Sequence, residues 1–401
     1  MVNKKTLILI AAFFILLIFL YYNRKNILMW ISGFIVLIIS FLNIQRKENL
    51  ENINITQEGG VVLKYFNKGE NRFTFDYENV IKVPEVTTMV FIDNNLLVTT
   101  KPGILKLIKN NIIEEEDLLD LKIDEPYFTN EGMEQGLLGL AYNSSSNLIY
   151  LCFCTTSQDE NYIMDLVVNE YSLDPINFNV KKNKNIITIP YKNDYHHGGT
   201  IIYKNNSLYL STGDGGPQGD PDMSSQNINN YYGKILKINL EDDNHIKNIA
   251  IGLRNPWKFS IDSQDRMFIG DVGWNQAEEV DLIQDINKNK IYNFGWSYFE
   301  GSVRLKLSKK FKDFDPPVFE YPTSDRFGRS VIGGYFLNNY NIYLFADYLG
   351  FIKAIEFNDT NWIQVGNEKL FSDEIIYTLG YDGVDIFIGT NKRLLKLIIN
   401  K

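Results

Sequence analysis

The feature that most constrains the fold is a pair of short apolar runs that recurs six times between residues 96 and 399. In each copy a turn rich in Asn, Asp or Ser leads into a β-branched or aromatic run, and a second apolar run follows. The first runs begin at residues 96, 148, 208, 267, 342 and 386, and the second runs cover 103–109, 169–174, 233–240, 278–283, 350–357 and 393–399. These lengths, with turn residues between them, are typical of β-strands.

The spacing of the strand pairs indicates how they are arranged. Successive first runs are 44–75 residues apart, which is typical of propeller blades with loop insertions of different length. The sequence therefore predicts an all-β, six-bladed β-propeller over residues 80–401. Residues 48–79 are expected to form a linker, in which the apolar runs within 61–77 could supply strands that close the ring.

Two uncharged apolar stretches precede this body, at residues 6–22 and 27–44. Each is about long enough to cross a bilayer, which takes roughly 17–25 residues. They predict a membrane anchor within residues 1–47, either one helix or a helical hairpin. By the positive-inside rule a hairpin would leave the body in the cytoplasm, whereas a single anchor at 27–44 would place it outside. The membrane side of the body stays open.

The formal charge divides at the same point in the chain. Residues 1–47 contain six basic residues and no acidic one, so their +6 leaves −15 on the remainder of a chain whose total is −9. A nucleic-acid backbone needs a basic surface. The acidic body therefore excludes nucleic acid as the main partner.

Polar residues stand at equivalent offsets in successive copies. Twelve or thirteen residues before the first runs lie Gln135, His196, Arg254, Arg329 and Asp373, and after three of those runs lie Asp214, Asp271 and Asp347. The innermost strand of each blade lines a propeller's central channel, so equivalent offsets place these side chains around one channel mouth. Polar groups that converge on one concavity are the expected form of a ligand site.

Seven segments in order resemble the glucose/sorbosone dehydrogenase family. They are EQGLLGLAY (134–142), HHGGTIIYKNNSLYLSTGDGG (196–216), GKILKI (233–238), GLRNPWKFSID (252–262), IGDVGWNQAEEVDLI (269–283), NFGWSYFEG (293–301) and SVIGGYF (330–336). That family includes sugar dehydrogenases that depend on pyrroloquinoline quinone (PQQ), aldose sugar dehydrogenases and hedgehog-interacting-protein-like proteins. The resemblance covers about residues 80–399 and implies a six-bladed propeller.

The resemblance also implies an activity and roles for individual residues. His196 would be the general base that takes the proton of an aldose's anomeric hydroxyl while hydride passes to PQQ, and an external acceptor would then remove the electrons. Asp214 would orient His196, and Arg254 would stabilise the quinone oxygen on which charge develops. Gln135 and Asn255 would bind the cofactor.

A calcium ion and the cofactor's carboxylates account for the remaining expected site residues. The family's Ca²⁺ is held partly by main-chain carbonyls, which correspond here to Gly273 and Trp274. PQQ carries three carboxylates, and Arg329 would help to bind them. At the sixth copy, however, Asp373 and Glu374 stand where the family has basic residues, and like charges repel.

A second hypothesis follows from these two acidic residues and from the acidic body. The protein would then be a non-catalytic, hedgehog-interacting-protein-like propeller, displayed at a membrane, that binds a protein or a glycan.

Overall fold

The computed structural model describes residues 63–242, 245–306 and 314–401. The chain divides into two compact units, residues 1–55 and 56–401, and the described residues all belong to the second. The predicted anchor at residues 1–47 lies outside them. Within the described ranges, none of the helices has the length and apolar character needed to span a bilayer.

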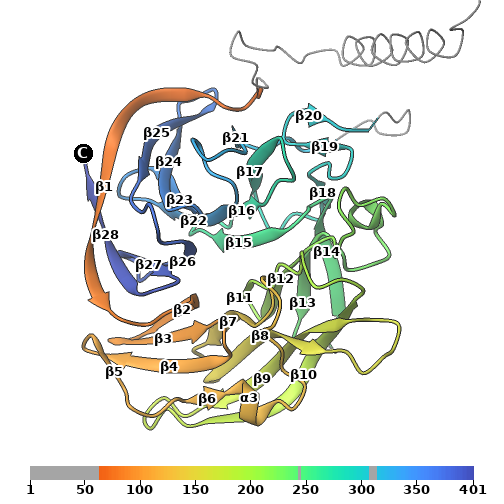
Figure 1. The fold of residues 1–401 in the computed structure, drawn as a ribbon, viewed down its shortest axis with the longest axis vertical. Coiled ribbons are helices and arrows are strands. Elements are labelled where there is room, and N and C mark those ends of the chain that lie inside the picture. Colours follow the sequence, from red (N-terminus) through yellow and green to blue (C-terminus); the bar gives the residue numbers. More distant parts are fainter. Residues whose placement is uncertain (1–62, 243–244, 307–313) are drawn as a thin grey trace, which may run out of the picture. The chain divides into compact units, whose positions relative to one another are not determined.

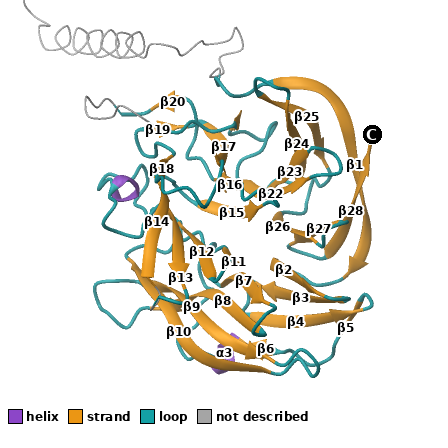
Figure 2. Cartoon of the chain, turned by 180° about the vertical axis from the view of Figure 1, so that it is seen from behind, coloured by secondary structure: helices purple, strands orange, loops and turns teal. Residues whose placement is uncertain are grey.

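Strands make up nearly all of the regular structure, as Figure 2 shows. The first sheet has the order β2-β3-β4-β5, with β6 also paired to β4: β2 Val86–Ile92, β3 Asn95–Thr100, β4 Ile104–Lys109, β5 Ile112–Ile113 and β6 Leu119–Asp120. The short helix α3 (Leu121–Asp124) follows. The second sheet is an antiparallel meander: β7 Leu137–Asn143, β8 Leu148–Thr156, β9 Met164–Leu173 and β10 Val180–Tyr191.

The third sheet is also antiparallel except at its outer edge, where β18 pairs in parallel with β14. Its strands are β11 Ile201–Lys204, β12 Ser207–Thr212, β13 Lys234–Asn239, β14 His245–Ile251 and β18 Tyr292–Asn293. A 3₁₀ turn, η2, covers Ser224–Gln226 in the loop between β12 and β13. The fourth sheet runs β15 Pro256–Ile261, β16 Met267–Asp271, β17 Ala277–Ile283 and β21 Phe319–Pro322, and a separate hairpin pairs β19 Phe299–Glu300 with β20 Val303–Arg304.

One eight-stranded sheet contains both the earliest described strand and the last strand of the chain. Its strands, in spatial order, are β22 Val331–Leu337, β23 Ile342–Asp347, β24 Phe351–Phe357, β25 Trp362–Lys369, β1 Lys68–Ile81, β28 Leu394–Asn400, β27 Ile386–Thr390 and β26 Ile376–Tyr381. β1 is antiparallel to β28 and parallel to β25. Of the two apolar runs expected within 61–77, the second (RFTFDY, 72–77) lies in β1, and the expected boundary at residues 79–80 falls within that strand.

The repeated strand pairs of the sequence are confirmed. Each first run is the second strand of its group, and each second run is the antiparallel strand next to it, for example β8 beside β9 and β16 beside β17. The strand before each first run lies at a sheet edge, and these edge strands contact one another in succession: β2 with β7, β7 with β11, β15 with β22, β22 with β26, and β26 with β2. Figure 1 shows them around a common centre. The fold is all-β and propeller-like.

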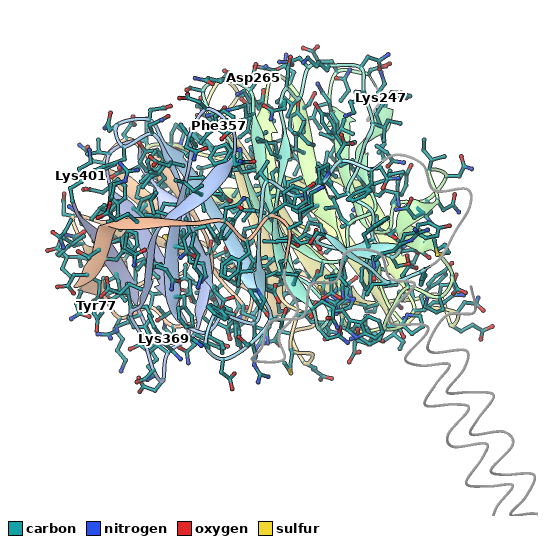
Figure 3. All side chains as sticks on the ribbon, turned by 90° about the horizontal axis from the view of Figure 1, so that it is seen from above. Tyr77, Lys247, Asp265, Phe357, Lys369 and Lys401 are labelled. Atoms are coloured by element: carbon teal, nitrogen blue, oxygen red, sulfur yellow. The ribbon has the colours of Figure 1, made fainter. Side chains whose placement is uncertain are left out.

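The antiparallel register determines which loops share a face. Asp347 pairs with Phe351, which pairs with Lys369, so these residues lie level with one another. Figure 3 shows Lys369 on one face, and Phe357, Asp265 and Lys247 on the opposite one. Asp347 is the last residue of β23, as Asp271 is of the corresponding strand β16. The site described next lies at these ends of the strands.

Candidate active site

His196 lies in the loop between β10 and β11, with a left-handed backbone (φ 59°) and a buried side chain. This conformation is uncommon for a residue other than glycine and is often found at functional sites. The loop is packed closely against the end of β12, since a Cβ on Gly213 would come within 2.0 Å of the His196 carbonyl oxygen. Only glycine at position 213 allows that approach, so the backbone places the imidazole with little freedom.

Asp214 is hydrogen-bonded to Nδ1 of that imidazole. Its Oδ1 lies 2.7 Å from His196 Nδ1, and its Oδ2 accepts a hydrogen bond of 2.8 Å from Trp296 Nε1. The Gly216 N–H donates to the same carboxylate at 2.8 Å. A carboxylate only accepts, so Nδ1 carries the proton and Nε2 keeps its lone pair. Asp214 therefore has the expected position of the group that orients a general base.

Arg254 faces the other ring nitrogen. Its Nη2 lies 3.0 Å from His196 Nε2 and donates to Gln218 Oε1 at 3.1 Å. Its Nη1 donates to the carbonyl oxygens of Val272 and Gly273 at 2.9 and 2.8 Å. The guanidinium is thus fixed at both ends, beside the atom that would accept a proton.

Two carboxylates fix the backbone around Arg254 and His196. Asp271, at the end of β16, accepts from the N–H groups of Arg254 and Asn255 at 2.8 and 2.7 Å. Glu134 Oε2 accepts from the His196 N–H at 2.6 Å and from Asn255 Nδ2 at 3.1 Å. The Arg254–Asn255 segment and the His196 loop are therefore joined through Glu134, which the sequence alone did not identify.

A cavity of about 250 Å³ opens beside this cluster. Its lining includes Asn255 and Glu134 from the site, together with Lys101, Met133, Trp257, Val272, Ser330, Ile332, Tyr348 and Tyr377. The walls are mostly aromatic and aliphatic with a few polar groups, which is typical of small-molecule sites. Lys101 adds an ammonium for which no ion pair is recorded among the described residues.

Two of the predicted cofactor residues have other partners. Gln135 is buried, but its Oε1 accepts from Thr129 Oγ1 and from the Gly132 N–H, within its own loop. The Arg329 side chain is more than half exposed and forms an ion pair of 2.6 Å with Asp325. Neither side chain has a recorded contact with His196 or Arg254.

The residues expected to hold calcium are also engaged. The Gly273 carbonyl accepts from Arg254, and the Trp274 N–H donates to Glu300 Oε1 at 2.7 Å. The Trp274 ring is partly exposed and packs edge-on against Trp296, with centroids 6.2 Å apart. Across the described part of the chain, no group of three or more His, Cys, Asp or Glu side chains is placed to hold a metal ion.

The two late carboxylates are both neutralised, which corrects the expectation that they repel an anionic cofactor. Asp373 is exposed and forms an ion pair of 3.0 Å with Lys392. Glu374 is buried and pairs with Arg393 at 2.6 Å, and it also accepts from Thr390 Oγ1. Each negative charge has a positive charge beside it, so like-charge repulsion is weak at this point.

Glu278 gives a prediction for the pH dependence of stability. Its Oε2 accepts from the N–H groups of Gly273 and Val331, and burial raises its pKa to about 8. The folded state therefore holds a proton that the unfolded state releases near pH 4.5, so this stabilisation is complete below about pH 4.5, falls as the pH rises from there, and is lost above about pH 8. Glu278→Gln keeps an acceptor oxygen and does not ionise.

We expect Glu278→Gln to match wild type in unfolding free energy at pH 5 and to exceed it at pH 9 by about 3–5 kcal/mol. Chemical denaturation at the two pH values measures this. Glu131→Gln, at an exposed position, serves as control and should follow wild type at both. A parallel loss of stability in Glu278→Gln and wild type between pH 5 and 9 would refute the prediction.

The fold is all-β and propeller-like, and a buried cluster of His196, Asp214 and Arg254 lies beside an aromatic-walled cavity. This combination is typical of a small-molecule site. The glucose/sorbosone dehydrogenase family model matches residues 83–340, which is more than half of the chain. The chain belongs to the glucose/sorbosone dehydrogenase family.

Individual proteins are also similar to this chain. The HIPL2 protein of Arabidopsis thaliana is 30% identical over 207 residues, which are 40% of this chain and 29% of that protein. The chain thus matches less than a third of the length of this curated relative. Two solved structures share the fold: the PQQ-bound aldose sugar dehydrogenase of Streptomyces coelicolor (TM-score 0.64, 18% identity, 82% of this chain and 99% of that one) and the apo aldose sugar dehydrogenase of Escherichia coli (TM-score 0.63, 15% identity, 81% and 99%).

Proposed function

We propose that this protein is a membrane-anchored oxidoreductase that oxidises an aldose sugar at its anomeric carbon and passes hydride to PQQ. The observation that carries the proposal is the row Asp214–His196–Arg254, in which a carboxylate fixes one ring nitrogen and a guanidinium faces the other. A row of this kind can take up a proton and stabilise a negative charge at the same place.

The residues of the chain divide the reaction between them. His196 Nε2, once the sugar hydroxyl replaces Arg254 Nη2 as its partner, takes the proton of the anomeric hydroxyl, and Asp214 stabilises the imidazolium that forms. The hydrogen on the anomeric carbon leaves as hydride, so the sugar loses two electrons and two hydrogens and becomes a lactone. When bound, PQQ supplies the two-electron acceptor for this hydride. Arg254 lies where it can donate to an oxygen that gains negative charge.

The cavity beside the site fits a flat, anionic cofactor in several respects. Trp257, Tyr348 and Tyr377 supply aromatic walls, and Lys101 supplies a cation for a carboxylate. Asn255 contributes a side-chain amide at the cavity wall. These residues would hold PQQ, with Gln135 and Arg329 as further contributors if their loops rearrange on binding.

The calcium ion that the resemblance implies does not fit this arrangement at Gly273. The Gly273 carbonyl oxygen already accepts from Arg254 Nη1, and a guanidinium at 2.8 Å from it repels a dication. We therefore assign no step to calcium. Calcium at Gly273 and Trp274 would require Arg254 to turn away.

We further propose that the propeller has six blades and that β1 closes the ring. The support is the parallel pairing of β1 with β25, in a sheet whose other neighbours are antiparallel, which divides the eight strands into two groups of four. Each group then has the size of one blade. In the second group β1 is the outer strand, bonded to β28 at the C-terminus of the chain.

The anchor and the electron acceptor complete the proposal. The apolar stretches at 6–22 and 27–44 would attach the propeller to a membrane as one helix or as a hairpin. An external acceptor would then reoxidise the cofactor at the site. The protein would be found in a membrane fraction, with the side of the propeller left open.

A second candidate is a non-catalytic propeller that binds a protein or a glycan. The similarity to the HIPL2 and HIPL1 proteins of Arabidopsis thaliana favours it, as do the −15 body and the engagement of Arg329 by Asp325. The ion pairs of Asp373 and Glu374 with Lys392 and Arg393 weaken the charge argument for this candidate.

Reconstitution tests the first candidate. The full chain, purified in detergent, is incubated with PQQ and Ca²⁺, and reduction of a dye is followed with a panel of aldoses. We expect turnover with at least one aldose that requires PQQ and His196. Absence of PQQ-dependent turnover with every aldose would favour the binding protein.

A further inference from the structure

A second cavity, of about 340 Å³, lies among the central edge strands and has no part in the proposed reaction. Its lining covers residues 88–91, 140–142, 200–203, 258–261, 333–335 and 378–379, which belong to or adjoin β2, β7, β11, β15, β22 and β26. A water molecule takes a share of about 30 Å³ in the liquid, so the space holds several small molecules. Lys258 is the one lining residue that carries a full charge when it is protonated.

Lys258 has no anionic partner within the described residues. Its Nζ donates to the Leu138 carbonyl oxygen at 2.9 Å and to Thr88 Oγ1 at 3.3 Å, and it lies 5.7 Å from the Trp257 ring centroid. An ammonium has three N–H donors, so one is left for the cavity. Burial lowers the pKa of Lys258 to about 7, because its charge is poorly solvated there.

The titratable groups near Lys258 do not supply a negative charge. Cys152 is buried, and burial raises the pKa of its thiol well above the ordinary value. The phenols of Tyr142, Tyr203 and Tyr335 complete the titratable lining, and burial raises the pKa of Tyr335 to about 12. None of the lining residues is Asp or Glu. The ammonium therefore faces a cavity wall without a counter-charge.

The backbone around the cavity has polar groups along the open edges of the central strands. Every central strand lies at the edge of its sheet, so alternate N–H and C=O groups on that side have no strand partner. Some of the carbonyls already accept from side chains: Leu138 O from Thr88 Oγ1 at 3.0 Å, and Trp257 O from Thr200 Oγ1 at 2.6 Å. A buried ammonium that has one uncommitted N–H and no carboxylate beside it is the chemistry that recognises an anion.

We propose that the central cavity binds a small inorganic anion of the chloride type beside Lys258 Nζ. The anion supplies the missing counter-charge and keeps Lys258 protonated. Because β15 lines both cavities, through Trp257 on one side and Lys258 on the other, the anion also stabilises the strand that carries the mouth of the candidate site. This site is independent of PQQ, calcium and the sugar.

Bromide diffraction and salt-dependent unfolding test the proposal on the full-length protein in detergent. Crystals soaked in sodium bromide should show anomalous density in contact with Lys258 Nζ. In solution, sodium chloride should raise Tm relative to sodium gluconate at equal ionic strength, by a saturable increase of roughly 2–4 °C. Lys258→Met should abolish this difference, whereas Lys237→Met, at a peripheral groove, should retain it.

The pH dependence gives an independent readout. An anion favours the protonated lysine, so the chloride effect should be largest below pH 7 and should fade as the pH rises toward 9. An absence of bromide density at Lys258, or an equal chloride effect in wild type and Lys258→Met, would overturn the proposal. Bromide density without a chloride effect in solution would show binding at crystal concentration only, and would also overturn it. If Lys258→Met fails to fold, the wild-type comparison of chloride with gluconate and the bromide map still decide.

Discussion

Replacing His196 with Ala is expected to lower kcat/KM for PQQ-dependent aldose oxidation by about 10²–10⁴-fold, the usual contribution of a positioned general base. The reason is geometric: within the part of the chain that the structure describes, His196 Nε2 is the one basic ring atom that faces a guanidinium while its partner nitrogen is fixed by a buried carboxylate. The loss should fall on kcat more than on KM, since the proton is transferred in the transition state. Dye reduction with saturating PQQ measures it.

His245→Ala is the matched control, because His245 is exposed at the far end of the β13–β14 pairing. It should keep wild-type activity, and both variants should give the far-UV circular dichroism of wild type. PQQ binding to His196→Ala should remain, which separates a chemical defect from a failure to load the cofactor. Activity of His196→Ala within about threefold of wild type would remove His196 from the reaction.

The second large effect is expected for Asp214→Asn. The substitution keeps the size of the side chain but presents an amide, which can donate to His196 Nδ1 and so favour the wrong tautomer. The analogous change in a Ser–His–Asp triad costs about 10⁴-fold in kcat, and we expect a loss of about 10²–10⁴-fold here. Dye reduction across a range of pH measures it, because a change of tautomer shifts the pH profile as well as the rate.

Trp296→Phe serves as the matched variant for Asp214. It removes the Nε1 donor to Asp214 Oδ2 but leaves the Asp214–His196 hydrogen bond in place. We expect a loss of at most about 10–100-fold, since a hydrogen bond to a charged group contributes about 1.5–3 kcal/mol. Equal losses in Trp296→Phe and Asp214→Asn, with unchanged pH profiles, would show that Asp214 has only a structural role.

Much of the fold could be predicted from the sequence, because strands with turn residues between them leave a local signal. The six first runs and their partners coincide with paired strands, and His196, Asp214, Arg254 and Asn255 come together as expected. The motif around each of these residues also fixes its loop conformation. A glycine-rich segment such as 213–216 is read directly from the sequence.

The rest of the site depends on contacts between distant loops, which spacing alone does not resolve. Counting back from a strand placed Gln135 at the channel mouth, but its neighbour Glu134 is the residue that contacts His196 and Asn255. Both residues lie in the turn region before β7, where side chains do not follow the alternation of a strand, so an offset counted from the strand misses the side chain that enters the site. Trp296 lies in the segment NFGWSYFEG, and the available signal is that an indole N–H needs an acceptor when it is buried.

The late acidic residues show the same limit for charge. Asp373 and Glu374 suggested repulsion when they were considered by themselves, whereas Lys392 and Arg393 neutralise them from the end of the next hairpin. Net charge along a sequence does not record such pairs, because the partners are 19 residues apart and meet only when β26, β27 and β28 pair. Lys101 lies in an early loop, and its place in the cavity wall beside Asn255 and Trp257 likewise depends on contacts between distant parts of the chain.

The most direct test of the account is a titration of the full chain with PQQ, followed by absorbance, with and without Ca²⁺. The account predicts saturable binding at micromolar or tighter affinity that is weakened by Lys101→Met, with the Asp373→Asn variant behaving like wild type. An absence of saturable binding under both conditions would contradict the account.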